Sequence, residues 1–340
     1  MFVAMAAEPF FSRSSWLNSL HMSTLTVALL QAQGHAPEAV LEGSGISTDD
    51  LRAMKRLIGP GQEQHVFANA LRLSAKPTLG IELGLRTRIS AYGLLGYALL
   101  SAPTFGEALR IGLSYPVLLG TYFNLSLHVE GPTAWLVATG YGEDEALRPF
   151  NVELCLASLK VVCGDLLGQP LPLRAAQFDY GETAGYSNGF ECPLHFNQPR
   201  NAIGFAAHWL EQPLPLADPI THQEMLDQCR RQNAELAANR AWLERVRALL
   251  AERLQTPPGL EELARQMNCS ARSLRRYLQQ QHTSYQQLLD ELRFSRAKEL
   301  LQQGELPIYR IAELLGFSET AGLRHAFQRW SGQPPSYFRV

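Results

Sequence analysis

The stretch that decides the fold is Ile308-Tyr-Arg-Ile-Ala-Glu-Leu-Leu-Gly-Phe-Ser318, an apolar-periodic run that ends in a glycine, a phenylalanine and a serine. The same pattern stands 48 residues earlier, where Leu263-Ala264 precedes Asn268-Cys269-Ser270. Each copy predicts a short helix, a tight turn and a second helix, over residues 271–280 and 319–330. Each serine is expected to cap its second helix, and Gly316 or Asn268 to supply the positive φ of the turn. The pattern is that of two helix-turn-helix units.

A long helix is predicted between the two units. Ser284 is expected to cap it, and its 19 residues run to about Gln303. At 1.5 Å per residue it would extend about 28 Å, close to the ~34 Å of one turn of DNA. Pro307 is expected at the first position of the helix that follows. The second helices of the two helix-turn-helix units, separated by about the length of this connecting helix, suit successive major grooves on one face of a duplex.

The first unit exposes arginines on its second helix. Leu274 and Leu278 lie one helical turn apart and are expected to pack inward, which turns Arg272, Arg275 and Arg276 outward. A guanidinium group matches guanine O6 and N7, and also phosphate oxygens. We therefore expect this helix to read base edges.

The second unit has fewer long donors on its outward face. Leu323, Phe327 and Trp330 are expected inside, and Gly322 within the helix either permits a close approach of the backbone to DNA or is incidental. We expect the first unit to dominate specificity and the second to clamp the phosphate backbone. The candidate DNA-binding residues of both units are Ser270, Arg272, Ser273, Arg275, Arg276, Ser318, Thr320, Ala321, Gly322, Arg324, His325 and Arg329.

Charge is separated along the chain, although the total is only −2. Residues 240–340 hold fifteen Arg and Lys against ten Asp and Glu, a net charge of +5, and residues 1–239 carry −7. A basic tail on an acidic body favours a polyanionic partner for the tail. The length of 340 residues, 46% of them hydrophobic, suggests two globular domains and excludes a disordered chain.

The part before the tail is predicted to be an α+β domain. Short amphipathic helices precede a β-hairpin over residues 122–139, which is followed by a helix over 146–167 and by two further strands. The predicted organisation is a flexible arm (1–20), an α+β regulatory and dimerisation domain (21–213), a linker (214–240) and an all-α domain with two helix-turn-helix units (241–340). A long polar helix is predicted over residues 220–253, so that it begins within the linker.

An effector pocket is predicted where the hairpin meets the helices. Its candidate residues, each of which has an aromatic core or surface position as the alternative, are Tyr92, Tyr97, Tyr122, Asn124, His128 and Trp135.

The tail resembles the DNA-binding domain of the AraC/XylS family of bacterial transcription regulators over residues 257–339. The matching stretches are Arg296-Ala-Lys-Glu-Leu-Leu301, the decisive run at 308–318 and Ala326-Phe-Gln-Arg-Trp-Ser-Gly-Gln-Pro-Pro-Ser-Tyr-Phe-Arg339. The resemblance implies base-reading roles for the positions in both second helices. The chain departs from the family at Ala321, Leu323 and His325, where serine, a large aromatic residue and arginine are frequent.

The front domain resembles the "arabinose-binding-type" N-terminal domain of one AraC subgroup, which includes ornithine-utilisation and quorum-sensing regulators. Leu94-Leu-Gly-Tyr-Ala-Leu-Leu-Ser-Ala-Pro-Thr-Phe-Gly-Glu-Ala-Leu-Arg110 and Leu210-Glu-Gln-Pro-Leu-Pro-Leu216 carry this similarity. It implies a dimerising, effector-sensing module and does not name an effector.

Other chemistries are disfavoured. Gly185-Tyr-Ser-Asn-Gly189 fits the G-x-S-x-G pattern of hydrolases but lacks the strand and helix that pattern needs, so we expect no catalytic residues and no enzyme. No metal-ligand spacing or nucleotide-binding loop is present, so no metal or cofactor is expected. The absence of a long apolar run and of an export signal predicts a cytoplasmic protein without a membrane partner.

Two functions remain open. The first is a sequence-specific regulator, an activator by expectation, that binds double-stranded promoter DNA as a homodimer under the control of a small-molecule effector of unknown identity. RNA polymerase is a further candidate partner. The alternative is a ligand-independent regulator whose front domain serves only dimerisation or protein partners.

Overall fold

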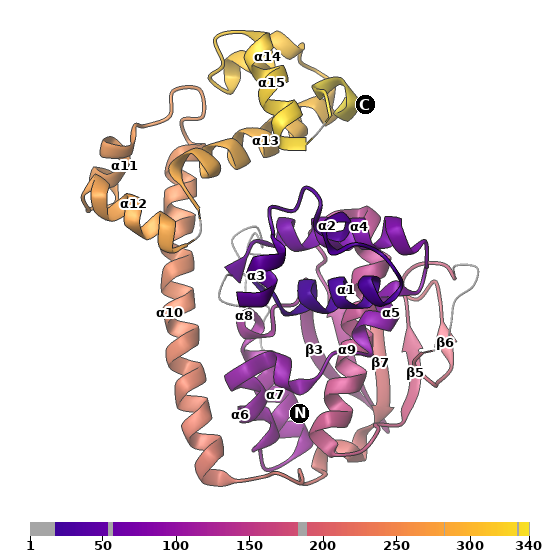
Figure 1. The fold of residues 1–340 in the computed structure, drawn as a ribbon. Coiled ribbons are helices and arrows are strands. Elements are labelled where there is room, and N and C mark those ends of the chain that lie inside the picture. The colour runs from indigo at the N-terminus through magenta and orange to yellow at the C-terminus, as the bar shows by residue number, and fades with distance from the viewer. Residues whose placement is uncertain (1–17, 54–56, 183–188, 282, 332, 340) are drawn as a thin grey trace. The chain divides into compact units, whose positions relative to one another are not determined.

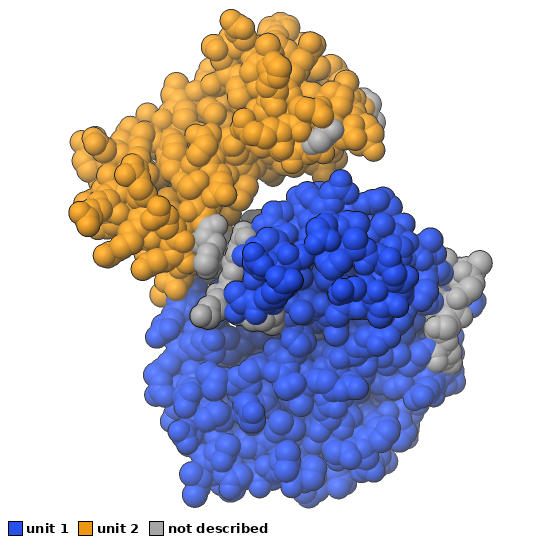
Figure 2. Space-filling model, viewed as in Figure 1, with its two compact units in different colours: residues 1–237 blue, residues 238–340 orange. Residues whose placement is uncertain are grey.

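The computed structural model describes residues 18–53, 57–182, 189–281, 283–331 and 333–339 (Figure 1). The chain forms two compact units, residues 1–237 and 238–340 (Figure 2). The first unit mixes helices with a sheet and the second is helical, which confirms the predicted fold class. Residues 1–17 of the predicted arm lie outside the described ranges. Within these ranges no helix has the length and hydropathy needed to cross a membrane.

The first unit consists of a helical front part and a sheet that the long helix α9 covers (Figure 1). Its elements are β1(Asn18–Ser19), α1(His21–Ala32), α2(Pro37–Leu41), α3(Thr48–Ala53), β2(Leu57–Ile58), α4(Pro60–Ser74), α5(Leu79–Gly84), η2(Ile89–Tyr92), α6(Gly93–Leu100), α7(Phe105–Ser114), α8(Pro116–Leu119), β3(Asn124–Glu130), β4(Thr133–Thr139), η3(Glu145–Leu147), α9(Arg148–Leu167), β5(Leu173–Gln177), β6(Leu194–His195), β7(Asn201–Ala206) and η4(Ala207–Glu211).

The larger sheet has the order β3-β4-β7-β5-β6, antiparallel except for the β5–β6 pair. The predicted hairpin is confirmed: β3 and β4 pair from Asn124↔Thr139 to Glu130↔Thr133 around a two-residue turn, in which Gly131 has φ +57°. All six residues of the central strand β7 are buried. The small strands β1 and β2 were not predicted, because two residues carry no detectable alternation.

The second unit continues from α10(Pro219–Ala251), which starts in the first unit and includes part of the predicted linker. Its further elements are α11(Leu260–Gln266), α12(Ala271–Gln280), α13(Tyr285–Gln303), α14(Ile308–Leu314), α15(Thr320–Ser331) and η5(Pro335–Phe338).

Each helix-turn-helix unit has its own small core, and α13 takes part in both. Leu288 belongs to the first core with Leu274 and Leu278, whereas Leu301 belongs to the second core with Phe327. Ser284 Oγ accepts from the Gln287 N–H (3.2 Å) and α13 has 19 residues, which confirms the predicted long helix and its cap.

The two turns repeat the same hydrogen bonds at an offset of 48 residues. The Cys269 N–H donates to the Ala264 carbonyl (2.9 Å) in the first turn, and the Phe317 N–H donates to the Ala312 carbonyl (2.9 Å) in the second. Asn268 has φ +53° and Gly316 has φ +75°, as predicted. The internal repeat in the sequence is therefore a repeat in the structure.

Two cap assignments shift by one residue. Ser318 was predicted to be the N-cap of a helix that starts at residue 319. The helix α15 begins at Thr320, so Ser318 lies one residue before the N-cap position. Pro307 is itself the N-cap residue of α14 and does not occupy the first helical position. In the first helix-turn-helix unit, by contrast, Ser270 is the N-cap residue of α12, and its Oγ accepts from the Ser273 N–H (3.1 Å).

Alanine at the two turn positions tests the repeat. A Cβ atom on Gly316 would lie 2.4 Å from the Gln255 carbonyl oxygen, so Gly316→Ala adds a steric overlap to the cost of positive φ. Asn268→Ala carries only the conformational cost, about 1–2 kcal/mol. We expect Gly316→Ala to destabilise residues 238–340 by at least about 1 kcal/mol more than Asn268→Ala does. Calorimetry of the full chain measures both, and equal losses would contradict the close approach.

Candidate nucleic-acid interface and regulatory cavity

The helix α12 presents arginine side chains to solvent. Leu274 and Leu278 are 0% and 1% exposed, while Arg272, Arg275 and Arg276 are exposed, as the helical period predicts. No carboxylate of the described residues lies within ion-pair distance of these three guanidinium groups. They are therefore available to an external anion or to base edges.

Ser270 and Ser273 have an identified structural role at the start of α12. Ser270 Oγ accepts from the Ser273 N–H and lies 2.9 Å from Ser273 Oγ. This capping fixes the first turn of α12, from which the arginines project. Neither serine needs DNA for a hydrogen-bond partner.

The exposed face of α15 carries smaller side chains. Leu323 and Phe327 are fully buried and Trp330 is half-buried against Phe327, as predicted. The candidate positions Ser318, Ala321, Gly322, Arg324, His325 and Arg329 are all exposed, and Thr320 is half-buried. Glu319 and Gln328 are exposed beside them.

Two residues of α15 have contacts that the sequence did not suggest. A Cβ atom on Gly322 would lie 3.3 Å from a ring carbon of Phe317, so the glycine makes room for that ring. Arg329 forms an ion pair with Asp290 of α13 (2.8 Å) and keeps 64% of its side chain exposed. Of the two arginines on this face, Arg324 is the one that the described carboxylates leave unpaired.

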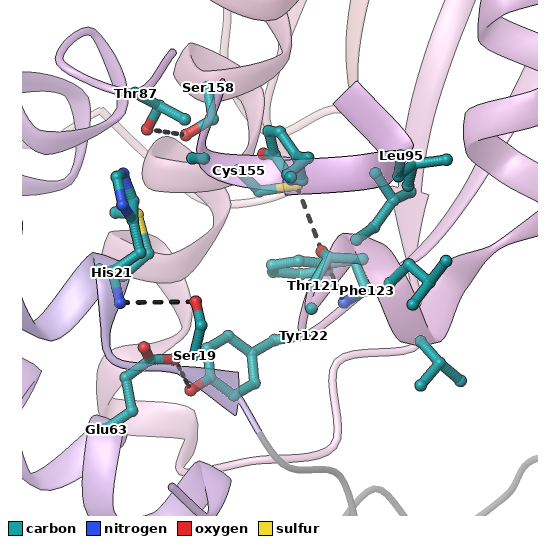
Figure 3. Close-up of a pocket in the computed structure, with 18 of the residues that line it drawn as sticks. Ser19, His21, Glu63, Thr87, Leu95, Thr121, Tyr122, Phe123, Cys155 and Ser158 are labelled. Atoms are coloured by element: carbon teal, nitrogen blue, oxygen red, sulfur yellow. Dashed lines mark hydrogen bonds between the residues drawn. The ribbon is translucent and has the colours of Figure 1, made fainter. Parts of the chain in front are cut away.

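A cavity of about 370 Å³ lies within the first unit, between β3, α9 and the surrounding helices (Figure 3). Tyr92 and Tyr122 line it, as predicted. The Tyr122 hydroxyl donates to Glu63 Oε2 (2.5 Å), and burial together with the Glu63 charge holds the pKa of Tyr122 well above its usual value. Burial also raises the pKa of Tyr92. Both phenols are thus neutral at physiological pH.

The other four predicted pocket residues lie elsewhere. Side chains alternate along a strand, and Leu125 points to the cavity, so Asn124 and His128 point to the opposite face of β3. Trp135 is the register partner of His128 and shares that face, where the Arg200 guanidinium covers its ring. Tyr97 is 63% exposed on α6.

Sequence reasoning missed the polar residues of the cavity. Thr87, Asn151 and Ser158 line it, and Asn151 and Ser158 come from the largely buried helix α9. The spacing of Asn151, Cys155 and Ser158 at i, i+4 and i+7 places them on one helical face and was the available signal. No group of three metal-ligating side chains is found in the described ranges. The G-x-S-x-G motif at 185–189 lies outside them except for Gly189.

The pKa of His21, which also lines the cavity, makes the stability of the first unit depend on pH. Burial lowers this pKa below 6.5, so the unfolded chain binds the proton more readily. The contribution of neutral His21 to the stability of the first unit is present above pH 6.5. It is lost as the pH falls through the lowered pKa of His21. We expect the Tm of the first unit to fall between pH 7.5 and 5.5, and His21→Gln to reduce that fall. His128→Gln, which replaces an exposed histidine of β3, is the control. An unchanged pH dependence in His21→Gln would contradict the assignment.

Family models match both units. Residues 34–214 match the "Arabinose-binding domain of AraC transcription regulator, N-term", and residues 263–340 match a "Helix-turn-helix domain". These matches confirm the two resemblances seen in the sequence.

Named relatives span most of the chain. The ornithine utilization regulator of Pseudomonas aeruginosa is 37% identical over 274 residues, which cover 80% of this chain and 81% of the relative. The transcriptional regulator VqsM of the same organism is 29% identical, covering 76% of this chain and 83% of the relative. Among solved structures, the transcriptional regulator CdpR of P. aeruginosa is 23% identical, covers 98% of this chain and 99% of its own, and has a TM-score of 0.44.

Proposed function

Because this chain belongs to the AraC family of transcription regulators, and so is a DNA-binding regulator, we propose that it is a promoter-binding activator controlled through its first unit. The observation that carries the DNA-binding part is the arginine face of α12, formed by Arg272, Arg275 and Arg276. The arginines of α12 read base edges in one major groove. The helix α15 enters the next groove and mainly contacts phosphates. Its exposed face offers Arg324, His325 and Gln328 as long donors beside the ion-paired Arg329, whereas α12 presents three arginines that the described carboxylates leave unpaired.

The salt dependence of binding tests this mode of recognition. Arginine–phosphate contacts release counterions, so affinity for duplex DNA should fall steeply with salt. We expect the full chain to lose at least about tenfold in affinity between 50 and 200 mM salt, the range over which phosphate-contacting proteins weaken. Fluorescence anisotropy with a labelled promoter fragment measures the slope. Binding that is independent of salt would overturn the proposal.

The first unit acts as the sensor of a small-molecule effector. The cavity of about 370 Å³ supports this role over the alternative of a purely dimerising domain. A ligand stabilises the state that it binds, so an effector must raise the Tm of the first unit and change DNA affinity. A metabolite screen should include L-ornithine, because one relative is named for ornithine utilization, and also uncharged molecules that suit the apolar lining. A metabolite screen in which nothing shifts Tm would favour the alternative.

The remaining partners follow from this role. The regulator acts as a homodimer through its first unit, which sedimentation of the full chain tests, and as an activator it contacts RNA polymerase at the promoter. Its place of action is the bacterial cytoplasm, where promoter DNA lies. The proposal contains no catalytic step.

A further inference from the structure

The lining of the regulatory cavity is mainly apolar. Leucines from α6, α8, β3 and α9 contribute to it, among them Leu95, Leu118, Leu125 and Leu154. A volume of about 370 Å³ falls in the lower part of the ~300–1,000 Å³ usual for small-molecule sites. The shape and chemistry suit a small molecule with a substantial hydrocarbon part.

Asn151 brings a hydrogen-bond acceptor to this lining. Its residue is 1% exposed, and its Nδ2 donates to Gln64 Oε1 (3.0 Å) and to the Tyr141 hydroxyl oxygen (2.9 Å). Tyr141 has one hydroxyl proton and donates it to the Asp144 carbonyl (3.0 Å), so towards Asn151 it must accept. In this orientation the Asn151 amide nitrogen is the donor of both hydrogen bonds.

This orientation leaves the carbonyl oxygen of Asn151 as an acceptor without use inside the protein. Among the described residues, Oδ1 has no hydrogen-bond partner, although the residue is buried and lines the cavity. Buried acceptors are almost always satisfied, by protein, by water or by a ligand. A donor group on a bound molecule meets this requirement.

A second polar point lies farther along the same face of α9. Ser158 Oγ and Thr87 Oγ1 are 3.0 Å apart, and both line the cavity (Figure 3). Two hydroxyls share one hydrogen bond, so one proton remains available to an acceptor on a ligand. Ser158 follows Asn151 by seven residues, which is about 10 Å along the helix axis. The cavity thus has an acceptor and a donor separated by apolar surface.

We propose that the cavity binds an uncharged, mainly apolar small molecule that carries a hydroxyl or amide N–H donor, which Asn151 Oδ1 accepts. The inference rests on the proposed sensor role and names the chemical class of the effector. A ligand carboxylate is disfavoured, because Glu63 places a carboxylate in the lining and no described lining residue is Lys or Arg. The Thr87–Ser158 pair serves an acceptor at the other end of the ligand.

Four probes with the same eight-carbon chain separate the classes: 1-octanol and octanamide as donors, methyl octanoate as an acceptor only, and octanoate as an anion. Calorimetric titration of the full chain gives each Kd, and the shift of the first unit's Tm gives a second readout. We expect at least one donor probe to bind at least tenfold more tightly than the ester and the anion. The proposal is overturned if no probe binds, or if the ester or the anion binds as tightly as both donors.

Variants locate the binding. Asn151→Leu removes the acceptor and should abolish the preference for donors over the ester, whereas Asn124→Leu, on the face of β3 turned away from the cavity, should keep it. If Asn151→Leu does not fold, Cys155→Phe, which places a ring between Asn151 and Ser158, should weaken every probe at least tenfold. Retained binding in Cys155→Phe, or an unchanged donor preference in a folded Asn151→Leu, would overturn the site. A probe that binds without changing DNA affinity contradicts the sensor role alone and leaves the ligand class standing.

Discussion

Replacing Arg276 by alanine is expected to lower affinity for the specific duplex about 10- to 100-fold, while affinity for unrelated DNA changes much less. A bidentate arginine–guanine contact contributes about 1–3 kcal/mol of discrimination. Arg276 is exposed on α12, six residues after the N-cap Ser270, and no described carboxylate pairs with it. Because binding needs no internal ion pair to break, the loss reports the contact with DNA. Selection from a randomised duplex pool gives the preferred site, and titrations of that site and its single-base variants measure the discrimination.

The matched variants are His325→Ala on α15 and Arg245→Ala on α10. His325 occupies the exposed face of the second reading helix, and its loss should reduce affinity without flattening base preference. Arg245 is exposed outside both reading helices, so its replacement removes the same charge as Arg276→Ala and should affect specific and unrelated DNA alike. A larger loss of base discrimination in His325→Ala than in Arg276→Ala would contradict the proposed division of roles between the two helix-turn-helix units.

The second unit was predictable from the sequence because its determinants are local. Helical spacing placed Leu274 and Leu323 inside, and a positive φ in each turn required Gly316 or tolerated Asn268. These choices depend on residues no more than a few positions away, and the offset of 48 made each copy a check on the other. The charge of the tail followed from counting.

The cavity was less predictable because its lining comes from segments far apart in the chain. The hairpin and its alternation were foreseen, but which face of β3 meets the helices is decided by how α9 lies across the sheet. The prediction that Trp135 and His128 line the cavity was therefore wrong, since both lie on the opposite face of the sheet, whereas Asn151 of the buried helix α9 does line it. Hydrophobic periodicity cannot reveal such a contact, since α9 is buried on most of its circumference.

The crossing of α5 and α9 depends on glycines whose role the sequence did not show. Gly80 and Gly84 stand one turn apart on α5 and face α9. A Cβ atom on Gly80 would lie 2.4 Å from the Phe150 carbonyl oxygen, and one on Gly84 would lie 2.6 Å from the Ala157 Cβ. Backbone and Cβ atoms cannot turn aside as a flexible side chain can. The two helices thus approach closely only because these positions lack side chains.

Gly84→Ala is therefore expected to destabilise the first unit by about 3 kcal/mol, although alanine favours a helix. The added methyl group would also meet the Leu154 carbonyl (2.7 Å) and the Ser158 amide (3.0 Å), so α9 must move and carry its cavity face with it. We expect lost stability and weakened ligand binding together. Gly112→Ala is the matched control, because its Cβ atom would meet only Leu99 side-chain atoms at 3.5 Å or more. That helical site should gain about 0.5–1 kcal/mol. Calorimetry of the full chain compares the two, and equal effects would show that α5 and α9 have room to separate.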